Sequence, residues 1–391
     1  MPDRASGTRE VQWDQVALGE IQVPGGIQGG PFGSQLHARD YVPAGIPLIM
    51  PKNMAENRLL STGHDLITPE DAQRLKVHQV IAGDIIVGRK GDLSRRALIR
   101  ESEKGWICGT DCIRIRVDRE LISPTYLSYY MGLRSVGGWL HRHDTGSTLP
   151  SLSTTNLARL PIVLPPRDYQ DEIAKSLKVL DDKIEVNFRI GYNALELARA
   201  NFARSMQHLS RTISLRDVID LRYGKALIEK DREPGKVPVF GGNGRSGWHS
   251  KSLSAGPGII IGRKGANAGS VSWSQGPFWV IDTAFFVHPL SNDIPLEYLY
   301  FLLQKAGFRG QVGDSAIPGL NRDIALSCAS MLPQESVMHA VAAELRTLLK
   351  LRAQLSDESA SLAELRDTLL PKLISGEIWV RDAERIVEGA T

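Results

Sequence analysis

The pattern of apolar positions is most regular near the C-terminal end of the chain. Leucine and valine recur there at intervals of seven, at Val341, Leu348, Leu355, Leu362 and Leu369, with Leu345 and Leu351 beside them. This spacing is typical of the seam of one helix that packs along another. The seam lies in a segment of about 40 residues, which as a helix would be roughly 60 Å long. We therefore predict a long helix over residues 334–376.

A second segment, Leu164–Met206, resembles the first at a distance of 168 residues along the chain. Its matching apolar positions are Ile173, Leu177, Leu180 and Ile184. We predict a second long helix over residues 167–210 and a pairing of the two helices through these positions. Asn187 falls in the same seam, where a buried Asn can fix the register of two helices at some cost in stability. The alternative is that the seam drifts around Gly191 and leaves Asn187 exposed.

The region before the first long helix has the pattern of short strands, turns and one short helix. We predict a strand and turn over Val11–Val23, a short strand that ends in a turn over Gly45–Met54, and a buried strand that runs into a tight basic turn over Asp84–Gly91. Asp92–Arg100 would continue it as a hairpin, Ile107–Val117 would form another strand, and Ser123–Leu133 would form a helix. A Gly-rich loop, GGIQGGPFGSQL, occupies Gly25–Leu36, and a polar loop, GSTLPSLSTTNL, occupies Gly146–Leu157. The mixture of elements indicates a globular domain.

The same order of segments returns in the second half of the chain. The strand and basic turn GIIIGRKG (Gly258–Gly265) repeat DIIVGRKG (Asp84–Gly91). Three further segments also have counterparts, namely VPVFGGNG (Val237–Gly244), LEYLYFLL (Leu296–Leu303) and DSAIPGLN (Asp314–Asn321). A whole unit is therefore duplicated.

The predicted fold is α/β (α+β), with two similar globular domains at residues 1–166 and 211–333. Each domain is followed by a long helix, and the two helices form an antiparallel coiled coil. Residues 377–391 remain as a C-terminal tail. Two copies of one unit joined in this way imply a pseudo-two-fold molecule. The backbone of duplex DNA has local two-fold axes. Two domains related by a pseudo-two-fold axis would therefore fit two similar DNA segments, one for each domain.

Composition supports a folded protein that works outside membranes. The 391 residues are 42% hydrophobic and 23% charged. No apolar run approaches the roughly 20 residues that cross a bilayer, and no signal peptide is present at the start, so we expect a cytoplasmic protein. Three cysteines without metal-ligand spacing indicate reduced, buried thiols and no metal site. The net charge of +3 is weak support for a polyanionic partner.

No motif indicates catalysis. Phe240–Gly244 (FGGNG) fits the spacing of an S-adenosylmethionine pocket, but a loop follows it where such a pocket needs a helix. The Pro165–Pro166 pair lacks the flanking residues of an amino-methyltransferase signature, and no Gly-Lys pair is followed by Ser or Thr as in a phosphate-binding loop. The pair His141 and His143 is typical of a solvated loop. We expect no catalytic residue and no cofactor in this chain.

Several segments together resemble one known family. They are GGPFGSQLHARDYVPAGIPLI, IIVGRKGDLSRRALI, GTDCIRI, GSTLPSLSTTNLARLPIVLPP, LDDKIEVNFRIGYNALELARANF and LRDTLLPKLISGEI. In this order they are similar to the DNA-specificity subunit of type I restriction-modification systems, and the resemblance covers nearly the whole chain. It implies that each globular part is a target-recognition domain that reads one half of a bipartite double-stranded DNA sequence.

The resemblance also implies partners. The long helices would set the gap between the half-sites and dock two modification subunits, which hold S-adenosylmethionine and methylate adenine. Restriction subunits with ATP-driven translocase and nuclease activity can join such a complex, as part of defence against phage. A purely structural alternative stays open, in which the chain is a non-catalytic coiled-coil adaptor whose globular halves bind protein.

The basic turns are the first candidates for DNA contacts. They contain Arg89, Lys90, Arg95 and Arg96 in the first copy, and Arg263 and Lys264 in the second. Arg and Lys in projecting turns can contact phosphates or reach O6 and N7 of guanine. The alternative for the two leading arginines is that they brace the fold through Asp111 and Asp282.

The loops supply the other candidates. In the polar loops these are Ser147, Thr148, Ser151 and Asn156, and in the second copy Ser315, Asn321 and Arg322. Shared Pro150/Pro318 and Leu152/Leu320 predict a common loop shape, which equally favours packing against the following helix. In and after the Gly-rich loop the candidates are Gln28, Ser34, Gln35 and Arg39, with Asn243 and Arg245 as their counterparts. Asn and Gln can pair with adenine through two hydrogen bonds.

Overall fold

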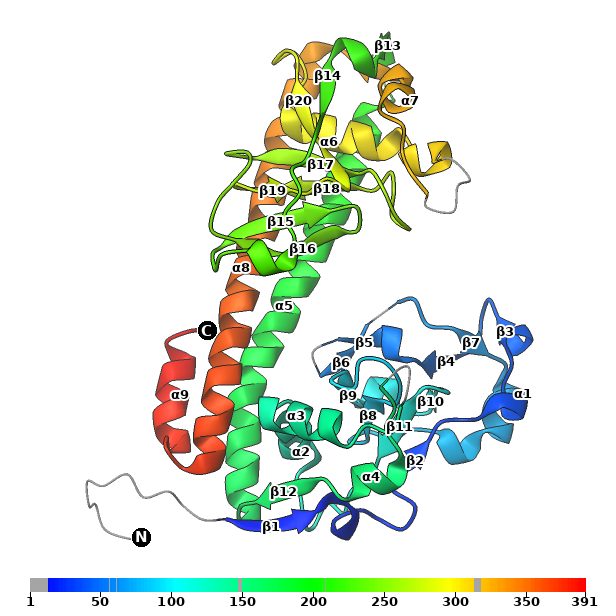
Figure 1. The fold of residues 1–391 in the computed structure, drawn as a ribbon, viewed down its shortest axis with the longest axis vertical. Coiled ribbons are helices and arrows are strands. Elements are labelled where there is room, and N and C mark those ends of the chain that lie inside the picture. The colour runs from blue at the N-terminus through cyan, green and yellow to red at the C-terminus, as the bar shows by residue number, and fades with distance from the viewer. Residues whose placement is uncertain (1–12, 56, 61, 147–149, 208, 313–317) are drawn as a thin grey trace. The chain divides into compact units, whose positions relative to one another are not determined.

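A computed structural model describes residues 13–55, 57–60, 62–146, 150–207, 209–312 and 318–391. The chain forms two compact units. Unit 1 contains Met1–Ile184 and Ala360–Thr391, and unit 2 contains Glu185–Ser359. Each unit therefore combines one globular region with one part of both long helices (Figure 1). Among the described residues, no helix is both long and apolar enough to cross a membrane.

The core of unit 1 is an antiparallel sheet. Its strand order is β2-β11-β8-β9, and the strands are β2 (Gln28–Gly29), β11 (Cys112–Ile115), β8 (Ile85–Gly88) and β9 (Arg96–Leu98). Strand β8 is buried along its whole length, as its unbroken apolar run predicts. The apolar face packs on α2 (Pro124–Tyr130) and on both long helices in one hydrophobic cluster.

A second, smaller sheet of unit 1 has the order β10-β4-β7-β3. Its strands are β10 (Ile107–Cys108), β4 (Ile46–Ile49), β7 (Leu66–Ile67) and β3 (Tyr41–Val42). Around the sheets lie β1 (Asp14–Ala17), β5 (Met54–Ala55), β6 (Arg58–Leu59), β12 (Pro161–Leu164), α1 (Pro69–Arg74), α3 (Arg134–Arg142) and α4 (Thr154–Ala158).

The prediction of one strand over Ile107–Val117 is wrong, because the chain breaks at Gly109. Strand β10 pairs with β4, whereas β11 pairs with β8 and β2 in the other sheet. The Gly109 backbone packs so closely that an added Cβ would lie 2.6 Å from the carbonyl oxygen of Ile49. Only glycine fits at that contact, so it allows the chain to pass from one sheet to the other.

Unit 2 repeats this arrangement. Its main sheet has the order β14-β20-β17-β18, with β14 (Ile219–Tyr223), β20 (Ala284–Pro289), β17 (Gly258–Gly262) and β18 (Val271–Ser274). Its second sheet contains β16 (Gly244–His249), β15 (Val237–Gly241) and β19 (Trp279–Val280). The remaining elements are α6 (Leu296–Lys305), α7 (Arg322–Ser327), β13 (Leu209–Ser214) and β21 (Ala329–Pro333). The duplication is confirmed in detail, since β15 pairs in parallel with β19 as β4 does with β10.

The long helices run from Arg167 to Ser205 (α5) and from Glu335 to Ser375 (α8), close to the predicted bounds. In unit 1, Asp181 Oδ1 of α5 lies 2.6 Å from Arg366 Nη1 of α8. In unit 2, the Asn187 amide donates to Glu358 over 2.9 Å and the Asn201 amide to Glu344 over 2.8 Å. Rising numbers in α5 meet falling numbers in α8, so the predicted antiparallel pairing is confirmed within unit 2.

Most of the predicted pairing residues are buried. Ile173, Leu177, Leu180, Ile184, Leu345, Leu362 and Leu369 belong to the hydrophobic clusters, and Val341, Leu348 and Leu355 are half-buried. Asn187 is only 2% exposed, which excludes the exposed alternative. Leu351, which the heptad pattern placed beside the seam, is instead exposed, while Leu349 is buried. The contact face therefore drifts around α8 relative to a strict seven-residue repeat.

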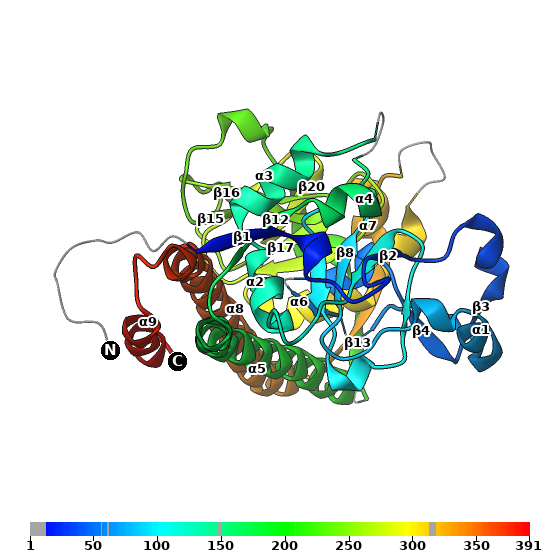
Figure 2. The ribbon, with the colours of Figure 1, turned by 90° about the horizontal axis from the view of Figure 1, so that it is seen from below.

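The predicted C-terminal tail contains a helix, α9 (Val380–Glu388). Val380, Ala383 and Val387 repeat at helical spacing and are buried in the cluster of unit 1. Figure 2 shows α9 beside the end of α8. All three cysteines are unpaired thiols, and Cys328 is less buried than predicted.

Candidate nucleic-acid interface

In unit 1 the basic turn and the polar loop bind each other through their backbones. The carbonyl of Arg89 accepts a hydrogen bond from the N–H of Leu152 over 2.9 Å. The N–H of Gly91 donates to the carbonyl of Pro150 over 2.9 Å. Leu152 is buried, so it anchors the loop while the turn stays at the surface.

Unit 2 repeats these bonds residue by residue. The carbonyl of Arg263 accepts from the N–H of Leu320 over 2.8 Å, and the N–H of Gly265 donates to the carbonyl of Pro318 over 3.0 Å. The predicted common shape is confirmed for the described proline and leucine of the two loops. Proline and leucine are shared because the loop backbone must fit the turn, which supports the packing role for these two residues.

The first arginine of each turn lies on an aromatic ring. Arg89 is 4.4 Å from the ring centroid of Phe32, which is 54% exposed. Arg263 is 4.9 Å from the centroid of Tyr223, and its Nη1 donates to the carbonyl of Asp282 over 3.1 Å. Cation–π contact holds a guanidinium in place without neutralising it. Arg263 is thus braced by the backbone carbonyl of Asp282 and not by its carboxylate. Arg89 is held by the ring of Phe32.

The lysines of the two turns are exposed. Lys90 Nζ lies 3.7 Å from Asp111 Oδ1, so the carboxylate predicted to brace Arg89 faces its neighbour instead. An exposed pair of this kind contributes little to stability. The Lys264 ammonium has no side-chain partner within the described residues. Both lysines lie at the surface, where a phosphate can reach them.

Arg95 and Arg96 point in different directions. Arg95 is exposed and contacts Asp92 over 3.3 Å. The guanidinium of Arg96 turns inward, where its Nε donates to the carbonyl of Ser128 over 2.9 Å. Burial and the nearby Arg366 lower the pKa of Arg96 to about 10. Arg95 precedes β9, whereas Arg96 is its first residue. The inward contacts of Arg96 correct the expectation that it projects from the turn.

Several polar-loop candidates are used by the fold. Asn156 donates to the carbonyl of His143 over 3.0 Å, and the N–H of Ser151 donates to Asp144 over 2.6 Å. Asn321 caps α7 by accepting from the N–H of Asp323 over 2.8 Å. These contacts hold the loops in shape. They use the side chains of Asn156 and Asn321, whereas Ser151 takes part through its backbone.

Of the remaining polar-loop candidates, the structure describes Arg322. Arg322 pairs with Asp220 and donates to the carbonyl of Leu221 over 2.9 Å. Ser147, Thr148 and Ser315 lie outside the described residues. As contacts to DNA, all the polar-loop residues stay predictions.

The Gly-rich loop of unit 1 lies next to the stacked Arg89. Gln35 accepts from the N–H of Phe32 over 3.0 Å, which closes the turn Gly33–Gln35 that also contains Ser34. Arg39 is exposed, 3.9 Å from Asp40. Gln28 accepts from Arg114 over 2.8 Å.

The residues expected as its counterparts in unit 2 lie elsewhere, in the tight turn between β15 and β16. That expectation is corrected, because β15 corresponds to β4, whereas the strand that corresponds to β2 is β14. Asn243 is exposed in that turn. The guanidinium of Arg245 lies 4.8 Å from the ring centroid of Trp248, whose side chain is 45% exposed. Arginine on an exposed aromatic ring occurs in both units, although the loops that supply the ring differ. Such rings are also platforms on which bases can stack.

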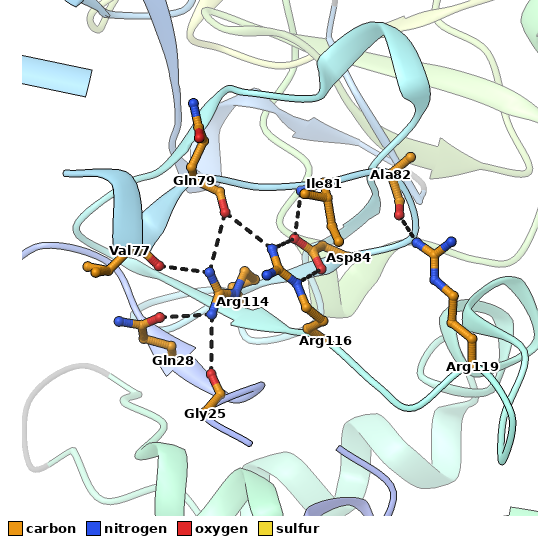
Figure 3. Close-up of polar contacts among 10 residues, drawn as sticks. All are labelled: Gly25, Gln28, Val77, Gln79, Ile81, Ala82, Asp84, Arg114, Arg116 and Arg119. Carbon is orange, nitrogen blue, oxygen red and sulfur yellow. Dashed lines mark hydrogen bonds and ion pairs between the residues drawn. The ribbon is translucent and has the colours of Figure 1, made fainter. Parts of the chain in front are cut away.

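Sequence reasoning missed the aromatic partners and one buried arginine. Phe32 is 57 residues from Arg89 and Tyr223 is 40 residues from Arg263, so spacing alone could not join these two pairs. Trp248 is only three residues from Arg245. Arg114 sits in the middle of β11 and is 6% exposed. Its only sequence signal is a charge inside the apolar run CIRIRV. Figure 3 shows Arg114 between the Gly-rich loop and the segment around Gln79.

Comparisons with known proteins agree with this geometry. Residues 44–191 match the family described as "Type I restriction modification DNA specificity domain". The chain is 24% identical over 220 residues to the specificity subunit of the type I restriction enzyme EcoprrI of Escherichia coli, covering 50% of this chain and 53% of that protein. It is 25% identical over 175 residues to the MjaIX specificity subunit of Methanocaldococcus jannaschii, covering 44% and 39%. The match thus spans about half the length of these relatives or less.

A solved structure extends the likeness of the fold. The S subunit of a type I restriction-modification system from M. genitalium covers 93% of this chain at a TM-score of 0.56 and 18% identity, with 96% of that chain covered. This likeness concerns the fold alone. The resemblance drawn from the sequence is confirmed: residues 44–191 match the DNA specificity domain of type I restriction-modification systems, and the chain has the fold of a specificity subunit.

Proposed function

We propose that this chain recognises a bipartite double-stranded DNA target as the specificity subunit of a type I restriction-modification complex. The observation that supports this most strongly is the repeated basic turn. Both units hold a GRKG turn against a polar loop by matching backbone bonds, with the lysine exposed and the arginine on a ring. A duplicated cationic turn on a rigid support is suited to two similar DNA segments.

The two turns would contact phosphates in the same way. Lys90 and Lys264 are exposed point charges, which bind phosphate without reading sequence. Arg89 and Arg263 are held on their rings before DNA arrives, so less conformational entropy is lost on binding. Sequence would be read by the side chains that differ around each turn. In unit 1 these are Gln28, Gln35 and Arg39, and in unit 2 they are Asn243 and Arg245.

The long helices offer a surface for partner subunits. In unit 2, Val186, Ile190 and Leu197 of α5 are exposed and recur at intervals of four and seven, as in a helix seam. Phe188 and Tyr192 are exposed on the other flank of the same helix. We place two modification subunits on such surfaces, with S-adenosylmethionine and ATP held by the partner subunits. This chain would supply recognition and assembly without chemistry of its own.

Gel shifts at graded salt test the proposal against the adaptor alternative. The chain is mixed with duplex DNA with and without modification subunits, and the bound fraction is followed as salt rises. Sequence-specific binding whose affinity falls steeply with salt supports the proposal, because phosphate contacts release counterions. Absence of binding to any duplex by the full complex would favour a protein-binding adaptor.

A further inference from the structure

Arg114 is a buried cation held almost entirely by neutral acceptors. Its Nη1 donates to the carbonyls of Val77 over 2.8 Å and Gln79 over 3.3 Å. Its Nη2 donates to the carbonyl of Gly25 over 3.2 Å and to Oε1 of Gln28 over 2.8 Å. Two of these four acceptors belong to the start of the Gly-rich loop. Arg114 therefore ties that loop to the segment around Gln79 (Figure 3).

No carboxylate is among the described hydrogen-bond partners of Arg114. The nearby carboxylate of Asp84 is taken by Arg116, whose Nε and Nη2 each lie 2.7 Å from it. The Nε of Arg114 is buried without a partner among the described residues. A buried charge with one donor unsatisfied is costly. The Arg114 guanidinium therefore needs hydrogen-bond acceptors, and the Gln28 side chain supplies one of them.

The bond to Arg114 fixes which way the amide of Gln28 points. An amide has one oxygen that accepts and one nitrogen that donates. The guanidinium can only donate, so the oxygen of Gln28 must face it. Figure 3 shows the amide nitrogen directed away from Arg114. Within the described residues that nitrogen forms no hydrogen bond. Gln28 thus presents a donor, without its usual acceptor.

Unit 2 lacks this arrangement. Arg114 is opposite Ile86 in β8 and Gln28 is opposite Arg114 in β2. At the equivalent positions of unit 2, Phe286 is opposite Ile260 and Arg222 is opposite Phe286. The contact between a buried arginine and a glutamine amide at these positions therefore belongs to unit 1.

We propose that Arg114 is a positioning residue that makes Gln28 a donor-only reader of the half-site recognised by unit 1. This rests on the proposed function. A donor-only side chain selects a base edge with an acceptor, such as O6 or N7 of guanine or O4 of thymine, and rejects the N4 amino group of cytosine. It cannot form the paired bonds to adenine that a free Gln can form.

The test replaces Gln28 by Glu in the complex with modification subunits. The variant keeps the size of the side chain and an oxygen for Arg114, but it removes the donor and adds a second acceptor. The target of each complex is read by sequencing methylated sites in DNA. We expect one position of one half-site to move from guanine or thymine toward cytosine, with a change in preference of about tenfold. The other half-site stays unchanged.

Thermal unfolding of the same variant is a readout that needs no DNA. A carboxylate beside the uncompensated Arg114 forms an ion pair, so we expect an unchanged or higher melting temperature. Arg114→Met is the second variant, and in it the freed amide should accept either kind of base edge at the same position. Gln334→Glu, an exposed charge change in unit 2, serves as the control.

Four outcomes are informative. An unchanged target in Gln28→Glu, or a lower melting temperature, would overturn the inference while leaving DNA recognition in place. A wild-type complex that methylates no defined sequence would instead overturn the proposed function, and with it the inference. A change confined to one position of one half-site supports both.

Discussion

The arginine and the lysine of each basic turn have different surroundings. Arg89 and Arg263 are packed on aromatic rings, whereas Lys90 and Lys264 extend into solvent. Packing makes replacement of either arginine ambiguous, since the fold and the DNA contact would change together. The lysines can be replaced with little effect on the fold, so they report on DNA alone.

Lys90→Ala and Lys264→Ala should each weaken binding to every DNA sequence to a similar degree. Loss of one phosphate contact lowers the slope of log affinity against log salt by about 1. Binding isotherms at several salt concentrations, on target and non-target duplexes, measure both quantities. Lys104→Ala is a matched control, because Lys104 is also exposed and, among the described residues, pairs with Glu101 in the turn Glu101–Glu103. Unchanged affinity and slope in both turn variants would count against the interface.

Single residues also mark where sequence reasoning ends. The repeated GRKG string was enough to place Arg89 and Lys90 in a projecting turn. It could not separate Arg95 from Arg96, because which face of β9 is covered depends on α2, whose packing is a long-range contact. Arg114 was missed for the same reason, since its acceptors lie up to 89 residues away.

At the scale of elements, the pairing of α5 with α8 depends on buried polar contacts as well as leucines. Arg366 of α8 is 7% exposed at its side chain and contacts Asp181 of α5 over 2.6 Å. Asp181 also accepts from the hydroxyl of Tyr129 over 2.7 Å. The ion pair thus joins both long helices to α2 of the globular part of unit 1.

Arg366→Ala should destabilise the protein by about 3 kcal/mol, because breaking a buried pair leaves a desolvated carboxylate behind. Chemical denaturation measures the loss. Arg385→Ala removes an exposed arginine that pairs with Asp382 in α9, and it should change the free energy of unfolding by no more than about 0.5 kcal/mol. Equal losses of unfolding free energy in the two variants would show that the Arg366–Asp181 pair contributes no more than an exposed pair.

The break between β10 and β11 gives a second test of an element. Gly109→Ala should cost about 2 kcal/mol, because the new Cβ would collide with the carbonyl of Ile49. The control is Gly137→Ala in α3, where nothing lies within 4 Å of the added atom. That change should stabilise the helix by up to about 1 kcal/mol. Thermal denaturation of both variants checks the opposite signs, and a stable Gly109→Ala protein would contradict the packing described.

Elements were predicted well where the local pattern decides them. The long helices, the buried strand β8 and helix α2 follow from periodicity, and the repeat made each prediction twice. Residues 107–117 were misread as one strand because their apolar pattern is continuous across Gly109, where two sheets divide the segment. Helix α9 was missed because its three buried positions form too short a stripe to stand out from a tail.

For the whole molecule, duplication with divergence is the central feature. The main sheets of the two units have equivalent strand orders, and the turn–loop bonds are the same in both. The side chains around the turns differ, as with Gln28 against Arg222. A shared scaffold with separate readers implies that each unit can be exchanged without altering what the other recognises.

The most direct measurement of this account is the sequencing of methylated sites made by the wild-type complex and by a chimera. In the chimera, residues 1–166 come from another specificity subunit. The account predicts a two-part target for the wild type, and for the chimera a target in which one part is replaced and the other is kept. A continuous target, or a chimera in which both parts change together, would contradict the account.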